Sequence, residues 1–267
     1  MNNVYFLKLG GSLITEKNTP HTVRQEVLER IAWEISAALI KNPQLRLVIG
    51  HGSGSFGHVP AKKYQTRQGV QTPQEWLGFV EVWREAIQLN ALVTKALHQA
   101  GIPAISFSPC AQILAVDGKI NSWDTVQIRS ALIHGLVPVI YGDVIFDSIR
   151  GGTIFSTEEQ FEFLATEFDP EKILLAGIEP GVWKDYPKCT EIIQNITPEE
   201  LRNLDQALNG SASPDVTGGM KSKVETMMSL IEKGVCREVI IFSGLEPGLV
   251  ANVISGQKTG TRLCSNT

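Results

Sequence analysis

The sequence predicts an α/β protein, a three-layer αβα sandwich around a mainly parallel central sheet. Three observations carry this prediction: short apolar runs alternate with helical patterns, glycine-rich loops follow several of the runs, and no internal repeat is present. Helices that cover both faces of a parallel sheet connect its strands in this alternating order. We expect residues 1–267 to form one domain, with an N-terminal lobe of about 1–168 and a C-terminal lobe of about 169–267.

Six apolar runs are expected to form the strands of the central sheet. Continuous apolar runs of this length are typical of parallel strands that helices cover on both faces. In chain order they are Val4–Leu9, Leu45–Ile49, Ala104–Phe107, Val137–Ile140, Lys172–Leu175 and Val239–Phe242.

Four segments between these runs are expected to be helices. The first is marked by an apolar residue at every fourth position, the pattern of an amphipathic helix, at Val23, Val27, Ile31, Ile35 and Leu39. A longer pattern, Pro73–Gln99, follows Thr72, a residue type that caps helix N-termini. Two further helices are predicted at Glu159–Glu167 and Ser222–Lys233, a hairpin at Ser148–Thr157 and a polar loop at Gly210–Gly219.

Composition and charge exclude several classes of protein. Of the 267 residues 43% are hydrophobic and 19% are charged, which is a globular balance. The net charge of −4 disfavours nucleic acid or an anionic membrane as a partner. The N-terminal MNNVYFLKLGG has one short apolar run with Lys8 inside it, which predicts neither a signal peptide nor a membrane span. Four widely spaced cysteines predict free thiols in a reducing cytoplasm: Cys110, Cys189, Cys236 and Cys264.

Three glycine-rich stretches predict a phosphate site. LKLGGSLITEK follows the first strand, GHGSGSFGH follows the second, and DVTGGMKSK opens a late helix. Ligands of open α/β sheets bind beyond the carboxyl ends of strands, where glycines let backbone N–H groups approach phosphate oxygens. Each stretch alone is a weak signal, because a glycine pair after a strand is often only a turn. The three stretches together are a stronger signal, because lysines lie in or near them, among them Lys8, Lys17 and Lys223.

Two other phosphate-binding classes fit less well. The sequence contains neither the Walker A pattern nor the H-R-D signature of protein kinases. The spacing Gly52-x-Gly54-x-x-Gly57 matches a dinucleotide fingerprint, but it closes the second strand rather than the first. Glu75 lies where a ribose-binding acid is sought, yet in a helical stretch. These observations disfavour a dehydrogenase.

The motifs, in their order along the chain, resemble those of the amino acid kinase superfamily. KLGGSLITEK, HGSGSFGH, GDVIFD and DVTGGMKSK carry the resemblance, which runs from Lys8 to the KTGTRL segment near the C-terminus. Within the superfamily, Gly-Ser-Phe-Gly-His ending at His58 is similar to the isopentenyl phosphate kinase family. Fosfomycin kinases share that histidine. The resemblance implies the amino acid kinase fold, ATP with Mg²⁺, a homodimer, an N-terminal acceptor lobe and a C-terminal nucleotide lobe.

The resemblance also implies roles for individual residues. The residues implied for phosphoryl transfer are Lys8, Lys17, His58 and Lys223, with Glu158 as a supporting acid. Those implied for the nucleotide are Gly10, Gly11, Ser12, Gly54, Glu179, Gly218, Gly219 and Lys223. Those implied for the acceptor are Ser53, Gly54, His58 and Thr157, with Trp76, Phe79, Val80 and Trp83 beside its apolar tail. No protein ligand of a metal is implied.

Three departures from the family pattern stand out. The usual three glycines of the second loop are Gly52-Ser53-Gly54, which Ser tolerates only if its φ is ordinary. Glu158 stands where an Asp is common. The usual acidic strand end is replaced by AGIEPGVW at 176–183, in which Glu179 is the substitute acid.

The chemistry favours a kinase whose acceptor is itself a phosphate. Such an acceptor has a second pKa of about 6 and is already a dianion at neutral pH, so cations are needed rather than a base. The expected reaction converts isopentenyl phosphate to isopentenyl diphosphate in isoprenoid biosynthesis of the mevalonate type. A fosfomycin kinase is the alternative, and a non-catalytic nucleotide-binding protein is disfavoured because all three lysines are present.

Several of these residues also have a purely structural interpretation. His58 could cap the following helix, and the aromatic stripe that includes Trp76 could belong to the core rather than to a pocket. Asp143 either orients a loop or is an acid at a strand end, and His51 is expected to be structural.

Overall fold

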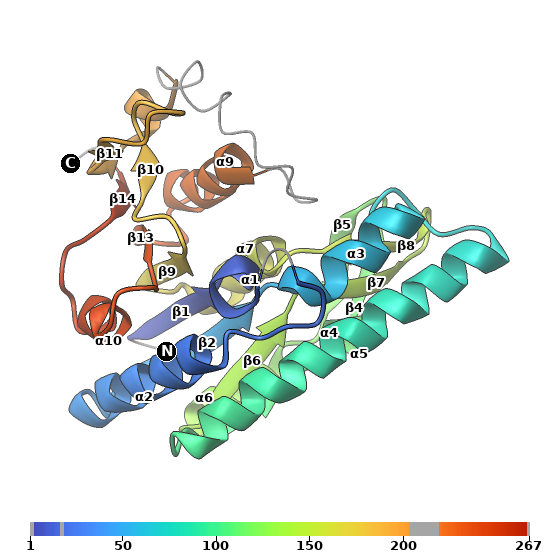
Figure 1. The fold of residues 1–267 in the computed structure, drawn as a ribbon, viewed down its shortest axis with the longest axis horizontal. Coiled ribbons are helices and arrows are strands. Elements are labelled where there is room, and N and C mark those ends of the chain that lie inside the picture. Colours follow the sequence, from blue (N-terminus) through green and yellow to red (C-terminus); the bar gives the residue numbers. More distant parts are fainter. Residues whose placement is uncertain (1–2, 17–18, 203–218, 266–267) are drawn as a thin grey trace.

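A central sheet crosses the whole molecule between two layers of helices (Figure 1). The computed structural model describes residues 3–16, 19–202 and 219–265. Within them, the sheet contains, in spatial order, β12 (Asn195–Ile196), β14 (Thr261–Cys264), β13 (Glu238–Ser243), β9 (Lys172–Gly177), β1 (Val4–Leu9), β2 (Arg46–His51), β6 (Val137–Tyr141) and β3 (Ala104–Ser106). Neighbours are parallel except β13 and β14. The predicted fold class is confirmed.

The two faces of the sheet bury different helices, because side chains alternate along each strand. In β1, Val4 and Phe6 face a core shared with α6 (Val126–Ile133), α7 (Thr157–Phe168) and α9 (Gly219–Glu232). Tyr5, Leu7 and Leu9 face the opposite core, which is shared with α2 (Gln25–Lys41), α4 (Pro73–Gln99) and α10 (Leu249–Ile254). By this alternation Lys8 lies on the same face as Phe6, toward α7.

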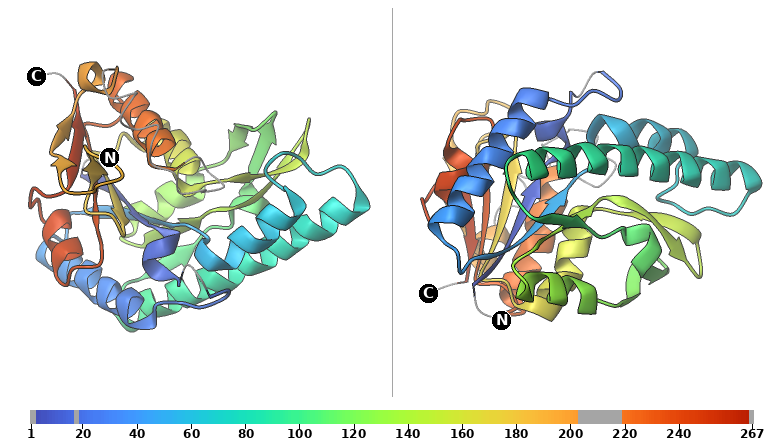
Figure 2. Two further views of the ribbon diagram at one scale, coloured as in Figure 1. Left: turned by 45° about the horizontal axis from the view of Figure 1, so that its top comes forward. Right: turned by 90° about the horizontal axis from the view of Figure 1, so that it is seen from below.

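A smaller sheet lies beside the N-terminal half of α4, which projects past the central sheet together with α3 (Gly54–Tyr64) (Figure 2). Phe79 of α4 packs there against Val144 in a third apolar cluster. The strands of the smaller sheet are, in order, β5 (Lys119–Trp123), β4 (Ile113–Val116), β7 (Asp143–Asp147) and β8 (Gly151–Phe155). The remaining short elements are α1 (Gly11–Ile14), α5 (Pro109–Gln112), β10 (Val182–Trp183) and β11 (Ile192–Ile193).

Most predicted elements form, with three corrections. The expectation that all six strands are covered on both faces is wrong for β3, an edge strand with exposed Ile105 and Ser106. The hairpin comprises β7 and β8 and so begins earlier than Ser148–Thr157. The fourth predicted helix, α9, starts at Gly219 instead of Ser222.

The long helix α4 starts where the sequence predicts. The Thr72 side chain accepts from the Glu75 backbone N–H, and the Glu75 carboxylate accepts from the Thr72 backbone N–H. This capping box satisfies two otherwise unpaired donors of the first turn. Glu75 therefore belongs to the helix cap rather than to a ribose site.

No helix in the described part of the chain is long and apolar enough to cross a membrane. All four cysteines are free thiols.

Candidate active site

The first two glycine loops meet backbone to backbone. Gly11 follows β1 and Gly54 follows β2, and because these strands are parallel neighbours their carboxyl ends lie side by side. A Cβ on Gly11 would lie 2.5 Å from the Gly54 nitrogen. Gly54 has φ of +50°, and a Cβ there would lie 2.2 Å from Thr15 Oγ1. Only glycine permits this approach, which brings two sets of backbone N–H groups to one place.

Thr15 joins the two loops. Its hydroxyl donates to the Gly11 carbonyl at 2.8 Å and accepts from the Ser55 N–H at 3.0 Å. The sequence pattern carries no signal for this residue. Between the loops Ser53 has φ of −77°, an ordinary value that serine adopts freely, so the condition set by its departure from glycine is met.

A carboxylate lies between two lysines at the same end of the sheet. Lys8 Nζ forms an ion pair with Glu158 Oε1, and Lys223 Nζ of α9 lies 3.9 Å from the same oxygen. Burial alone would raise the pKa of Glu158, but the two ammonium groups outweigh it and hold the pKa at about 2. Glu158 is therefore ionised at neutral pH and fixes the two lysines near each other. The longer side chain of glutamate reaches both.

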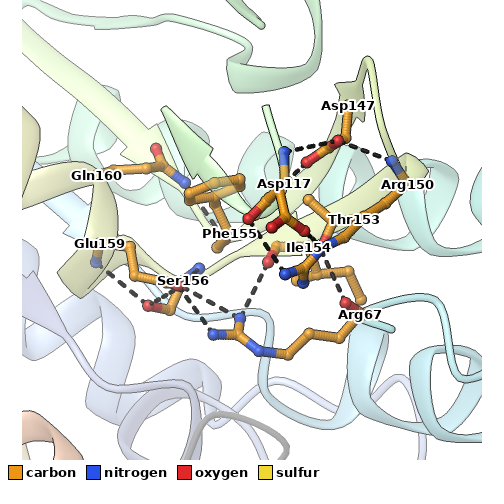
Figure 3. A network of polar contacts seen from close by, with 11 residues as sticks. Arg67, Asp117, Asp147, Arg150, Thr153, Ile154, Phe155, Ser156, Glu159 and Gln160 are labelled. Atoms are coloured by element: carbon orange, nitrogen blue, oxygen red, sulfur yellow. Dashed lines mark hydrogen bonds and ion pairs between the residues drawn. The ribbon is translucent and has the colours of Figure 1, made fainter. Parts of the chain in front are cut away.

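The start of α7, which carries Glu158, is clamped from outside by a polar network (Figure 3). Ser156 and Glu159 form a capping box. Arg67 donates to both oxygens of the Glu159 carboxylate at 2.9 and 3.2 Å and to the Ile154 carbonyl at 2.9 Å. The Thr153 hydroxyl donates to the Arg67 carbonyl at 2.9 Å. The motif Ser156-x-x-Glu159 could have revealed the cap, but nothing in the sequence pointed to Arg67.

Thr157 docks the same helix start onto β2. Its hydroxyl donates to the His51 carbonyl at 2.7 Å. A Cβ on Gly50 would lie 2.3 Å from Thr157 Cγ2, so this glycine allows the helix to come close. Gly142, at the end of β6, faces both Thr157 and the second loop, since its Cβ would lie 3.9 Å from Thr157 Oγ1 and from the Ser53 nitrogen. Thr157 therefore lies at the junction of the loops.

A cavity of about 190 Å³ opens between α7 and α9. Glu158, Gly219 and Lys223 line it, with Arg67 on its wall. Gly219 begins α9, and helix N-termini favour phosphate groups because their N–H groups are unpaired. A larger cavity of about 510 Å³ lies elsewhere, between α4 and β3, and contains none of the predicted site residues. The smaller cavity is the one lined by Glu158 and Lys223.

His58 lies inside α3, so the suggestion that it caps a helix is wrong. It is exposed and follows Gly57, whose missing side chain leaves room for Ser53, only 2.7 Å from where a Cβ would be. His58 is therefore an exposed residue on the helix that begins at the second loop.

The four residues predicted beside an apolar tail divide into two pairs. Trp76 and Phe79 lie in one aromatic group with Phe146, with ring centroids 5.1 to 6.0 Å apart. Val80 and Trp83 lie on the outer side of α4, 54% and 38% exposed. The first pair faces the smaller sheet and the second faces outward.

The remaining predicted residues are placed as follows. Gly10 is tied to β9, because its N–H donates to the Ala176 carbonyl at 2.8 Å, and Ser12 lies in the short helix α1. Glu179 follows β9 and accepts a hydrogen bond from the Trp183 indole at 2.7 Å. Lys17 and Gly218 lie outside the described residues.

Asp143 is a buried carboxyl at the start of β7. Burial raises the pKa of this carboxyl to about 8, so it is mainly protonated at neutral pH. It accepts from its neighbour Val144 at 2.8 Å and from the backbone of Cys110 in α5. Of the two interpretations of this residue, the one in which it orients a loop agrees with these contacts.

The described residues provide no protein cage for a metal ion. Among them no three His, Cys, Asp or Glu side chains gather in a way that could hold a metal. Glu158 Oε2 is buried without a hydrogen-bond partner there, but the ammonium groups at Oε1 oppose a second cation. The site residues therefore do not fit a resident metal.

Comparison with known proteins identifies the family. The model of the amino acid kinase family matches residues 3–243. The isopentenyl phosphate kinase of Methanocaldococcus jannaschii is 34% identical, and the match covers 96% of this chain and 97% of that protein. The chain belongs to the isopentenyl phosphate kinases.

Other members of the isopentenyl phosphate kinase family agree. The enzyme of Methanothermobacter thermautotrophicus is 35% identical over 96% of this chain and 97% of its own length, and that of Arabidopsis thaliana is 27% identical over 86% and 84%. A crystal structure of an isopentenyl phosphate kinase superimposes with a TM-score of 0.82 at 32% identity, covering 97% of this chain and 99% of the other.

Proposed function

We propose that this protein transfers the γ-phosphoryl group of ATP to isopentenyl phosphate and so forms isopentenyl diphosphate for isoprenoid biosynthesis. The observation that carries the proposal is the Lys8–Glu158–Lys223 group, which lies where two glycine loops and a helix N-terminus meet. The names of its relatives supply the acceptor.

The site meets the main requirement of this reaction, which is to bring two anions together. The acceptor is a dianion near neutral pH, since the second pKa of a phosphate monoester is about 6, and needs no base. Lys8 and Lys223 offset the repulsion between donor and acceptor. The Gly10 N–H is already bonded to the Ala176 carbonyl, so the backbone N–H groups of Gly11 and Ser12, with the start of α9, hold the donor phosphates. Those of Ser53 and Gly54, with His58 and Thr157, hold the acceptor.

Mg²⁺ would accompany ATP without a protein cage. The described residues offer no group of metal ligands, so the nucleotide phosphates themselves would hold the ion. Its contribution would be further neutralisation of phosphate charge. Every other part of the proposed mechanism uses this chain's own lysines, backbone N–H groups and His58.

The acceptor's apolar tail would extend from the second loop toward the smaller sheet. Trp76 is partly exposed and offers an aromatic surface in that direction, with the buried Phe79 packed against it, whereas Val80 and Trp83 would contribute only at its outer rim. We assign the acceptor to residues of about 1–168 and the nucleotide to the C-terminal lobe with the loop after β1. The tail would be short, because the aromatic rings already contact one another.

We further propose that the protein is a cytoplasmic homodimer. The free thiols suit a reducing compartment. β3 is an exposed edge strand whose Ile105 is 41% exposed, and such edges pair readily with another chain. Light scattering is expected to give the mass of two chains, and the mass of one chain would refute the dimer.

The test of the activity is ADP release with ATP and Mg²⁺, with isopentenyl phosphate or fosfomycin as the acceptor. We expect turnover of isopentenyl phosphate by the wild-type protein and a large rise in its KM in His58→Ala. His134→Ala is the control, because that histidine is exposed and bonds only its own helix at Ser130. Turnover of fosfomycin alone would refute the acceptor assignment, and normal kinetics in His58→Ala would refute the role of His58.

A further inference from the structure

His51 joins the second glycine loop to the edge of the central sheet. It ends β2, is 1% exposed, and its ring stacks on Tyr141 with centroids 5.6 Å apart. Nδ1 lies 3.1 Å from the Gly52 carbonyl oxygen, and Nε2 lies 3.2 Å from Oδ1 of Asn90 on α4. The Nδ2 of Asn90 is in turn 2.7 Å from the Ser106 hydroxyl of β3. A chain of polar contacts thus runs from the loop to the sheet edge.

The imidazole of His51 is neutral and its proton can be located. Burial lowers the pKa of His51 to about 4, and the charge of Lys8 acts in the same direction. A neutral ring has one N–H, and a backbone carbonyl can only accept. The contact with Gly52 therefore requires the proton on Nδ1. The structure sets Asn90 Oδ1 against Nε2, and a neutral ring cannot donate to that oxygen and to the Gly52 carbonyl at once. A carbonyl cannot be reversed, but the oxygen and nitrogen of an amide are assigned from their contacts. With the amide turned over, its NH₂ group donates to Nε2 and its oxygen accepts from the Ser106 hydroxyl.

Holding the Gly52 carbonyl also fixes the next N–H. The Gly52 carbonyl and the Ser53 N–H belong to one planar trans peptide and point in opposite directions. A donor that anchors the carbonyl on the His51 side therefore directs the Ser53 N–H away from it. Among the described residues, the Ser53 N–H donates to no protein group. Gly142 has no side chain that could cover it.

We propose that His51 is a positioning residue whose Nδ1–H holds the Gly52 peptide so that the Ser53 N–H is presented to the acceptor phosphate. The proposal deepens the proposed function, because the phosphate that it serves is the one assigned there. The buried Asn90 side chain, itself bonded to the exposed Ser106 hydroxyl, keeps the proton on Nδ1. Without that anchor the peptide could rotate and present its carbonyl oxygen to the phosphate, which would repel it.

Two substitutions of equal polarity separate positioning from packing. In His51→Asn the side-chain amide can place a donor where Nδ1 was, whereas in His51→Gln it reaches only the position of Nε2. Both lose the ring that stacks on Tyr141, so their melting temperatures should fall together. The bond that would be lost is the one from the Ser53 N–H to the charged acceptor phosphate. We therefore expect KM for isopentenyl phosphate to rise about tenfold or more in His51→Gln and less than about threefold in His51→Asn. KM for ATP should change equally in both.

His98 supplies a matched control. Its Nε2 is 2.8 Å from the Ala104 carbonyl, so it too is a histidine bound to backbone, but it is far from the glycine loops at the end of α4. His98→Asn and His98→Gln should leave KM for isopentenyl phosphate unchanged. Equal rises of KM in the two His51 variants, or no rise in either, would overturn the proposal.

A second measurement does not depend on the acceptor. Nitrogen NMR of histidine-labelled wild-type protein reports which ring nitrogen of His51 carries the proton, and we expect Nδ1 at neutral pH. A proton on Nε2 would overturn the proposal whatever the kinetics show. If the wild-type protein does not turn over isopentenyl phosphate, the proposed function fails, and this measurement still decides whether His51 can hold Gly52.

Discussion

Replacing Glu158 by Gln removes the only negative charge that the described residues place between Lys8 and Lys223. The pKa of Glu158 is lowered from 4.5 to about 2, so its ionised form stabilises the folded protein by about 3 kcal/mol at neutral pH. This contribution is complete above the unfolded-state value of 4.5 and is lost as the pH falls toward 2. Between pH 7 and 3.5 the wild-type protein should lose about 1 kcal/mol of folding stability that the Gln variant does not lose.

Urea unfolding followed by tryptophan fluorescence at pH 7 and pH 3.5 measures this difference. At pH 7 the Gln variant should be about 3 kcal/mol less stable than wild type, because Lys8 and Lys223 both lose the carboxylate charge of Glu158. The difference in unfolding free energy between wild type and the Gln variant should narrow at pH 3.5. The kcat of the Gln variant should also fall at least about tenfold, because Lys8 is no longer fixed.

Glu162→Gln is the matched control for Glu158→Gln. Glu162 is on the same helix but is paired at the surface with Lys233, at 3.2 Å, so its loss should change stability by less than about 1 kcal/mol. If the gap between wild type and Glu158→Gln is the same at both pH values, Glu158 is not the ionised partner of the lysines.

Two further predictions concern glycine and a buried acid. Gly54→Ala should destabilise the protein by about 1–3 kcal/mol more than Gly135→Ala, because both glycines have positive φ but only Gly54 also lacks space for a Cβ. Equal losses of stability in a urea titration would argue against the close approach of the loops. Asp143→Asn should gain stability relative to wild type as the pH rises from about 4 to 8, because the unfolded carboxyl ionises there while the folded one, whose pKa is raised to about 8, keeps its proton. A difference that stays constant over that range would contradict the raised pKa.

The sequence predicted the central strands and long helices because their apolar patterns are regular. β1 matches its predicted residues, and α4 begins at its predicted cap. The burial of β3 could not be predicted, because its apolar run resembles the others and only the strand order places it at an edge. Helix α3 could not be predicted either, because its two glycines and Pro60 oppose helix formation and only tertiary contacts override them.

For the candidate site, motifs located the loops but not what supports them. Lys8, Glu158 and Lys223 are far apart in the sequence, and their motifs alone predicted that they meet. Thr15 and Arg67 act through hydrogen bonds to other segments, and such contacts leave no periodic or motif signal. The position of His51 at a strand end predicts only a structural role. Its hydrogen bonds could not be predicted, because they depend on where the fold places Gly52 and Asn90.

The backbone contact between Gly11 and Gly54 limits how this enzyme family can change. In the proposed function these loops hold the donor and the acceptor. Because main-chain atoms set the spacing between them, no single side-chain substitution can lengthen or shorten it gradually. Mutations that alter acceptor preference must therefore accumulate on the walls, such as α4 and the β7–β8 hairpin. A scaffold of this kind can diversify its substrates while the distance between the reacting groups is inherited unchanged.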